Sequence, residues 1–331
     1  MNGRKVIMIY ALACSMIAIL SFTGNPGLTK AKMENKNSIK PLEVHLGKIK
    51  ILIFSDGQMA FDKAQPTFAP NIAKAEFEAR SQMLHLRKDA VDLGINVMLI
   101  KVSERTILID AGMGKHFGDS QGKLLENLID AGISPESITD ILITHAHRDH
   151  IGGLISREGS IIYPNAKYHM AKEEYDFWMS ENPDFSHSKL NAEQVKGTIS
   201  FTKNVLGKIK KNVILFNPGA ILFSIIQTDL AAGHTPGHTI FTITSEGKSI
   251  KNIVDVFHTT LMISEPEWGV SLDVNFEQGI KTRTNILEEC YTQKSLVISS
   301  HLPWPGIGYI DKRDKYLWSP LNYYNPSEIE L

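Results

Sequence analysis

Histidine and aspartate residues gather in three short blocks that lie far apart in the chain. The seven residues are His145, His147, Asp149 and His150 in the first block, His234 and the later Asp255 in the second, and His301 in the third. The first block is too tight for one face of a helix, so it predicts a turn that leaves a strand. Imidazole and carboxylate groups are ligands of Zn²⁺, Mn²⁺, Co²⁺ and Fe²⁺. Seven of them exceed what one tetrahedral structural zinc uses, so the blocks predict a site for two adjacent ions.

The rest of the pattern predicts strands alternating with helices in one α/β fold. The expected strands are 50–55 (ended by a turn at Asp56 and Gly57), 96–102, 106–110, 138–144, 166–170, 220–228, 239–244, 249–254 and 295–299. The expected helices are 74–93, 123–131, 172–179, 191–203 and 276–294. Each metal-binding block follows the C-terminal end of a predicted strand. Loops held there by a rigid sheet can converge, so the separated blocks are expected to form one site.

The N-terminus carries the features of a secretory signal peptide. Arg4 and Lys5 precede an apolar run over 6–22, a helix-breaking segment over 24–27 and the small Ala31, with no acidic residue. We therefore expect residues 1–31 to be a signal peptide and the mature protein to be exported, either periplasmic or secreted, without stable membrane insertion. The alternatives are an uncleaved membrane anchor and a lipoprotein. The lipoprotein is disfavoured because apolar residues continue well past Cys14.

Composition narrows the class of partner. With 331 residues, 43% of them hydrophobic, the chain can bury a large core. Cleavage after Ala31 would remove three of the 35 Lys and Arg residues and none of the 36 acidic ones, so the formal net charge would fall from −1 to about −4. A mildly acidic surface argues against nucleic acid as a partner. Cys290 would be left as the only thiol, which excludes an intramolecular disulfide.

The order of these motifs resembles the metallo-β-lactamase superfamily. The resemblance covers about residues 50–305 and is carried by 109–112, 144–153, 233–239, Asp255 and His301. It implies an αββα sandwich, with two mixed β-sheets packed face to face and helices on the outer faces, as a single hydrolase domain over 32–331. The finer resemblance is to the N-acyl homoserine lactonases and the exported methyl parathion hydrolases. Residues 301–308 look like the segment that carries the last ligand in the latter.

The resemblance also implies a role for each of the seven residues. His145, His147 and His234 are expected to hold one ion, Asp149, His150 and His301 the other, and Asp255 to bridge them. Zn²⁺ is the expected metal, with Mn²⁺, Co²⁺ or Fe²⁺ as alternatives. A shared water, activated to hydroxide, would attack the substrate. Asp149 would accept its proton, which makes Asp149 and Asp255 the expected catalytic carboxylates.

Other residues near the blocks receive weaker predictions. We expect His238 to support the site rather than bind metal, and Asp110 to orient a ligand or loop backbone beneath the metals. His258 is expected either to reach the substrate or to pack in the core. Aromatic and apolar residues that would line a pocket or belong to the core are Phe257, Met262, Trp268 and Trp304.

Four functions are compatible with this pattern. The first is a quorum-quenching lactonase that opens the ring of N-acyl homoserine lactones. The second is an organophosphate or aryl-ester hydrolase that uses the same two metals. A β-lactamase is disfavoured because those enzymes typically lack the bridging carboxylate. An electron-transfer scaffold is disfavoured because its flavin-linked relatives carry Glu at the position of His147. The expected partner is a small lactone or ester, and a homodimer is also considered because relatives of this kind often dimerise.

Overall fold

The computed structural model describes residues 39–322 and 328–331, and all of these belong to one compact unit of the chain. The predicted signal peptide, residues 1–31, lies outside the described residues. Within the described part, no helix is both long and apolar enough to cross a lipid bilayer.

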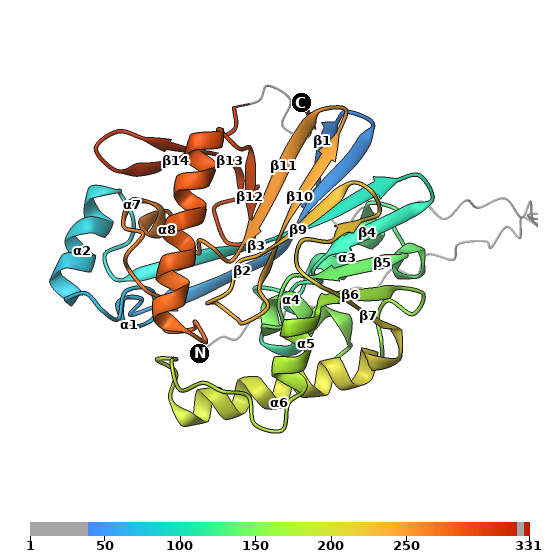
Figure 1. The fold of residues 1–331 in the computed structure, drawn as a ribbon, viewed down its shortest axis with the longest axis horizontal. Coiled ribbons are helices and arrows are strands. Elements are labelled where there is room, and N and C mark those ends of the chain that lie inside the picture. The colour runs from blue at the N-terminus through green and yellow to red at the C-terminus, as the bar shows by residue number, and fades with distance from the viewer. Residues whose placement is uncertain (1–38, 323–327) are drawn as a thin grey trace, which may run out of the picture. The chain divides into compact units, whose positions relative to one another are not determined.

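Fifteen strands of the described chain form two mixed sheets (Figure 1). The first sheet has the order β15-β1-β2-β3-β4-β5-β6-β7, and the second has the order β14-β13-β12-β11-β10-β9-β8. The strands of the first sheet are β1 (Leu42–Leu46), β2 (Ile49–Asp62), β3 (Ala90–Val102), β4 (Arg105–Ile109), β5 (Asp140–Ile143), β6 (Lys167–Ala171), β7 (Val213–Phe216) and β15 (Glu328–Glu330). Those of the second are β8 (Ile221–Leu222), β9 (Ile226–Leu230), β10 (Thr239–Ser245), β11 (Lys248–Val254), β12 (Val297–Ser299), β13 (Ile307–Lys312) and β14 (Tyr316–Pro320).

Helices cover the outer faces of both sheets. The α-helices are α1 (Gln65–Phe68), α2 (Lys74–Met83), α3 (Leu124–Asp130), α4 (Arg148–Ile151), α5 (Lys172–Met179), α6 (Ala192–Ile209), α7 (Thr260–Ser264) and α8 (Phe276–Gln293). Short 3-10 turns lie at Gly114–His116, Pro135–Ser137, Gly152–Leu154 and Lys210–Asn212. In Figure 1, α5 and α6 lie beside β6 and β7, while α8 lies beside β13 and β14.

Three hydrophobic layers show that the arrangement is an αββα sandwich. Successive side chains of a strand point to opposite faces of its sheet. On β5, Ile141 and Ile143 therefore pack against the helices on one side, and Leu142 packs between the two sheets. On β10, Ile240 packs toward α7 and α8, and Phe241 faces the layer between the sheets. Both sheets are thus buried on two faces, which confirms the predicted fold.

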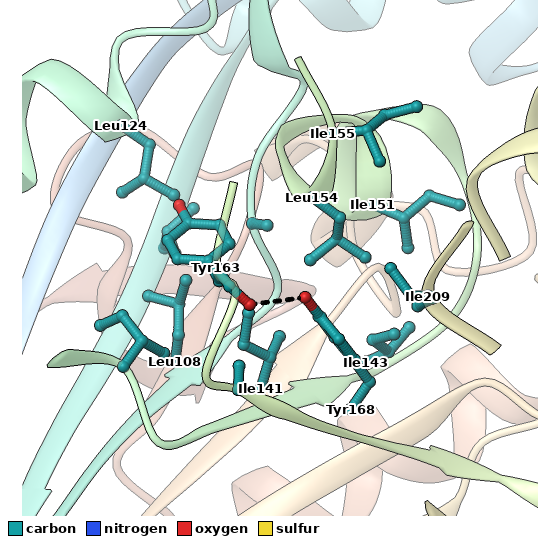
Figure 2. Packing of buried hydrophobic residues seen from close by; sticks show 14 of the residues in the cluster. Leu108, Leu124, Ile141, Ile143, Ile151, Leu154, Ile155, Tyr163, Tyr168 and Ile209 are labelled. Carbon is teal, nitrogen blue, oxygen red and sulfur yellow. Dashed lines mark hydrogen bonds between the residues drawn. The ribbon is translucent and has the colours of Figure 1, made fainter. Parts of the chain in front are cut away.

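The layer beneath the first sheet is closed by helices α3 to α6 (Figure 2). Ile151 and Ile209 pack there against the strand residues Ile141 and Ile143. The buried hydroxyl of Tyr168 donates a hydrogen bond of 2.8 Å to the carbonyl oxygen of Tyr163, which satisfies the polar group inside this apolar layer. The core therefore holds the C-terminal end of β5 in a fixed position.

Three predictions of secondary structure were wrong. The predicted turn at Asp56 and Gly57 is a β-bulge, because β2 continues to Asp62 after its pairing with β3 shifts by one residue. The predicted helix 74–93 ends at Met83, and residues from Ala90 onward belong to β3. The predicted strand 220–228 is two short strands, β8 and β9, joined by a turn in which Phe223 has a positive φ. Apolar spacing alone does not distinguish a buried strand from a helix segment in such places.

Candidate metal centre

The four strands that precede the metal-binding blocks all end at one side of the sandwich. His145 and His147 follow β5, and α4 then carries Asp149 and His150. The other three residues, His234, Asp255 and His301, follow β9, β11 and β12. The structure thus brings all seven predicted residues together, as expected from the strand ends.

One group consists of His145, His147 and His234. One ring nitrogen from each of them lies within 4.8 Å of the others. Nδ1 of His147 is 2.8 Å from Nε2 of His234. His145 and His234 are buried. Three convergent imidazoles are a common ligand set for a divalent transition-metal ion.

The other group consists of Asp149, His150, Asp255 and His301. Its potential ligand atoms also lie within 4.8 Å of one another. Nε2 of His301 is 3.2 Å from Oδ2 of Asp149, and Nε2 of His150 is 3.6 Å from the same oxygen. The group combines imidazole with carboxylate, which suits Zn²⁺, Mn²⁺, Fe²⁺ or Co²⁺.

Asp255 lies between the two groups. Its Oδ2 is 3.3 Å from Nε2 of His234 and 3.1 Å from Nε2 of His301, and its Oδ1 is 3.2 Å from Nε2 of His150. The preceding residue, Val254, has φ of 50°, which is rare for a β-branched residue and costs on the order of 1–3 kcal/mol. This strained backbone at the end of β11 directs the carboxylate toward both groups.

Buried atoms without hydrogen-bond partners show that the residues fit metal ions. Within the described chain, His145 Nε2, His150 Nε2 and Asp255 Oδ1 are buried and make no hydrogen bond of acceptable geometry, although His150 Nε2 and Asp255 Oδ1 lie 3.2 Å apart. An unpaired buried polar atom costs about 1–3 kcal/mol. All three atoms face their own group of candidate ligands, so coordination to a cation would satisfy them.

The electrostatics of the cluster also favour cations. Burial would raise the pKa of Asp255, but the positive charges of His150 and His301 hold it well below its usual range. Burial would lower the pKa of His234 and His301, yet neighbouring carboxylates raise these values to about 9 and about 10. In the absence of metal, protons on these histidines balance the carboxylates. A metal ion would replace those protons.

Residues outside the two groups hold the ligands in orientation. Oδ2 of Asp110 is 2.8 Å from Nδ1 of His150, and the same carboxylate accepts a hydrogen bond of 2.9 Å from the Thr144 N–H. Asp110 therefore contacts both a candidate ligand and the loop backbone, as expected of an orienting residue. The carbonyl oxygen of Gly94, on β3, is 2.8 Å from Nδ1 of His301. These contacts leave Nε2 of each histidine facing the site.

Two supporting carboxylates were missed by the sequence reasoning. Oδ1 of Asp273 is 2.8 Å from Nδ1 of His234. Glu174, fully buried, accepts hydrogen bonds from four groups, namely the N–H groups of Ala146 and Gly237, the hydroxyl of Thr235 and the indole of Trp178. It thus ties α5 to the loops that carry the first and second blocks. Neither carboxylate stands in a motif, so no local signal points to it.

The structure also places the weaker candidates. His238 is buried, with Nδ1 3.1 Å from the carbonyl oxygen of Ala231, and its Nε2 accepts from the Asp255 N–H at 3.4 Å. This contact lets His238 position Asp255, in keeping with the supporting role expected of it. His258 stacks on His301 and lies 3.4 Å from Oδ2 of Asp255. Burial lowers the pKa of His258 to about 4, so it is neutral near pH 7.

Two adjoining cavities open onto the site. One, of about 490 Å³, contacts both groups and has apolar walls that include Met59, Phe61, Phe117 and Leu272. The other, of about 700 Å³, lies beside His301 and contains the half-exposed Trp304. Leu93, Ser120, His258 and His301 line both cavities. Phe257, Met262 and Trp268 belong instead to the hydrophobic core beneath the second sheet.

Comparisons with known proteins agree with this geometry. The family model of the metallo-beta-lactamase superfamily matches residues 90–250. AidC, a dizinc quorum-quenching lactonase solved with its product N-hexanoyl-L-homoserine, is 32% identical, with a TM-score of 0.82 over 86% of this chain and 99% of AidC. The hydrolase AbOPH is 25% identical, with a TM-score of 0.80 over 88% of this chain and all of AbOPH.

More distant structures share the fold. AiiA of B. thuringiensis, solved with N-decanoyl-L-homoserine at its active site, is 16% identical, with a TM-score of 0.54 over 80% of this chain and 94% of AiiA. No curated protein matches the chain.

Proposed function

Because the chain belongs to the metallo-β-lactamase superfamily and is a metal-dependent hydrolase, we propose that it opens the lactone ring of N-acyl homoserine lactones. The observation that carries this proposal is the position of Asp255 between two groups of candidate ligands, directly beneath a cavity with apolar walls. Such a cavity suits an acyl chain attached to a polar ring.

The seven residues would divide between two divalent ions. His145, His147 and His234 would hold one ion, Asp149, His150 and His301 the other, and Asp255 both. When bound, two such ions polarise an ester carbonyl and lower the pKa of a shared water. Zn²⁺ is the metal we propose, and Mn²⁺, Co²⁺ and Fe²⁺ suit the same ligands.

The protein's own groups would orient and move the reacting proton. Asp149 lines the 490 Å³ cavity, and the charge of His150 holds its pKa well below the usual range even though burial would raise it. Bound cations would keep Asp149 ionised in place of that charge, so that its carboxylate can accept a proton from the attacking water. Its Oδ2 also lies 3.2 Å from His301 Nε2, which keeps it beside the second group.

Similarity to AidC supports a lactone substrate over the alternatives. AidC is more similar to this chain than AbOPH is, at 32% against 25% identity, and AidC was solved with the product N-hexanoyl-L-homoserine. The lactone assignment is our inference from this similarity and from the apolar walls of the cavity.

A second candidate is organophosphate or aryl-ester hydrolysis. Trp304 follows His301 closely and is 39% exposed in the larger cavity. An exposed indole beside a metal centre can stack on an aromatic leaving group, and such aromatic pairs contribute about 0.5–1.5 kcal/mol.

A substrate panel distinguishes the two candidates. The protein is loaded with Zn²⁺ and assayed with N-hexanoyl and N-dodecanoyl homoserine lactones, an aryl ester, a phosphotriester and a β-lactam. We expect a lactone to lead in kcat/KM by at least tenfold, which corresponds to about 1.4 kcal/mol in the transition state. A lead of that size for the phosphotriester or aryl ester would replace the lactonase assignment with the second candidate.

A matched pair of variants tests the role of Asp255. Asp255→Asn should lose bound metal and turnover together, because it removes a charge that both groups share. Asp229→Asn makes the same change on β9, at a residue that belongs to neither group and lines neither cavity, and should keep both. An Asp255→Asn protein that keeps two ions and full turnover would exclude the bridging role.

We also propose that the protein is exported after cleavage near Ala31. This proposal is supported by the basic, apolar and helix-breaking segments of residues 1–31. N-terminal sequencing of the protein from extracellular or periplasmic fractions is expected to begin near Lys32. An intact N-terminus on cytoplasmic protein would contradict it.

A further inference from the structure

Arg148 brings an unused guanidinium to the cavity above the metal centre. It is the first residue of α4 and lies in the chain between the candidate ligands His147 and Asp149. All three residues line the 490 Å³ cavity. Both of its chain neighbours are candidate metal ligands, so the Cα atom of Arg148 lies next to the metal centre.

The guanidinium has no protein acceptor. In the part of the chain that the structure describes, Arg148 makes neither a hydrogen bond nor an ion pair, and its contact is with the ring of Phe117, 5.1 Å from Cζ to the ring centroid. The buried Arg283, by contrast, donates to two carbonyl oxygens and lies 3.5 Å from Oδ2 of Asp273. Arg148 therefore keeps five N–H donors for a ligand.

Nearby side chains leave these donors free. The carboxylates among the described residues that line this cavity are Asp149 and Asp255, and both belong to the candidate metal groups. The side-chain oxygen of Gln194 accepts from the N–H of Asn191 in the cap of α6. Arg148 is an exposed residue, and contact with the ring of Phe117 holds its guanidinium beside the apolar wall of the cavity.

We propose that Arg148 binds a carbonyl oxygen of the substrate that lies close to the bond being broken but is not part of it. This inference rests on the proposed function. In an N-acyl homoserine lactone, the acceptor that meets this description is the amide carbonyl, which is separated from the scissile carbonyl carbon by one carbon and one nitrogen. Arg148 thus selects N-acylated lactones over lactones with a plain alkyl chain.

Two substrates of equal length isolate this contact. N-hexanoyl homoserine lactone and α-heptyl-γ-butyrolactone have the same ring and the same number of chain atoms, but the second lacks the amide. The selectivity ratio is kcat/KM for the first lactone divided by kcat/KM for the second. A hydrogen bond from a charged donor contributes about tenfold to a hundredfold in such a ratio.

The Arg148→Met variant of the zinc-loaded enzyme is expected to lower the selectivity ratio at least tenfold, mainly through KM of the amide substrate. Arg148→Lys keeps the charge but loses the planar fork, so its selectivity ratio should fall between those of the wild type and Arg148→Met. Arg313→Met removes the same charge from an exposed turn and should keep the wild-type ratio within threefold. Metal content and melting temperature are measured for each variant, so that damage to the centre is detected.

The outcomes separate the two proposals. A wild-type enzyme that opens neither lactone refutes the proposed function and this inference with it. If the wild type is active and the selectivity ratio of Arg148→Met lies within threefold of the wild-type ratio, the role of Arg148 is overturned. The proposed lactonase function is then unaffected. Equal losses on both lactones in Arg148→Met leave the ratio unchanged, so they overturn the role of Arg148 as well.

Discussion

Replacement of Asp273 by Asn is expected to weaken one metal ion selectively and to destabilise the fold. Asp273 is fully buried, its Oδ1 lies 2.8 Å from Nδ1 of His234, and its Oδ2 lies 3.5 Å from the guanidinium of Arg283. The carboxylate therefore orients a candidate ligand and balances a buried cation. Asn is nearly the same size, so the change tests charge and hydrogen bonding rather than packing.

The magnitudes follow from these two contacts. Loss of a carboxylate that orients a ligating histidine lowers metal affinity by about tenfold to a hundredfold. A buried charge left without its partner costs about 3–5 kcal/mol. Arg283 keeps two hydrogen bonds of 3.0 Å, to the carbonyl oxygens of Val256 and Trp268, so we expect the lower end of this range, about 3 kcal/mol.

Two assays measure these effects separately. Titration with Zn²⁺ in competition with a chromophoric chelator gives the affinity of each ion, and urea unfolding with excess chelator gives the stability of the metal-free fold. Asp229→Asn is the control for the change in charge. The reasoning is refuted if Asp273→Asn binds both ions as tightly as the wild type, or if the metal-free variant unfolds at the wild-type urea concentration.

Three further predictions concern buried titratable groups. Glu174→Gln replaces one oxygen that accepts two hydrogen bonds, so the free energy of unfolding should fall by about 2–4 kcal/mol in urea denaturation; a change below 0.5 kcal/mol would contradict this. Neighbouring carboxylates raise the pKa values of His150, His234 and His301 above neutrality in the metal-free protein, so metal uptake should release protons and tighten as pH rises from 6 to 8. Calorimetry in buffers of different ionisation enthalpy checks this, and equal heats would exclude it. Burial raises the pKa of Asp56 to about 6, above its unfolded value, so the wild type should lose about 2–3 kcal/mol relative to Asp56→Asn as pH rises from 4 to 7. Parallel stability curves of these two proteins across that range would show that Asp56 does not titrate there.

The metal-binding blocks could be predicted because their chemistry is local. His145, His147, Asp149 and His150 stand within six residues, and few structures other than a metal site place so many ligands so close together. The apolar, β-rich run over 138–144 predicts the strand that delivers them. The expectation that the blocks meet then follows from where a sheet places the ends of its strands.

The bulge in β2 shows where local reasoning stops. Asp56 and Gly57 have the composition of a turn, but the Asp56 carboxylate accepts hydrogen bonds from the N–H groups of Met113, Gly122 and Leu124. Gly57 lies so close to the carbonyl oxygen of Ser120 that a Cβ would come within 2.1 Å of it. These partners are more than fifty residues away in the chain, so no local pattern reports them.

By itself, the sequence determined the fold class and the identity of the candidate ligands, because strand periodicity and ligand chemistry are properties of short segments. Only the tertiary structure decided which residues support those ligands. Asp273 is 39 residues from His234 in sequence, and Glu174 is 28 residues from Ala146. An isolated Asp in a loop, such as Asp273, or an isolated Glu in the first turn of a helix, such as Glu174, is usually a solvated residue, and its role depends on burial against a distant donor. The packing of two sheets and their helices creates that burial, so it exists only in the folded chain.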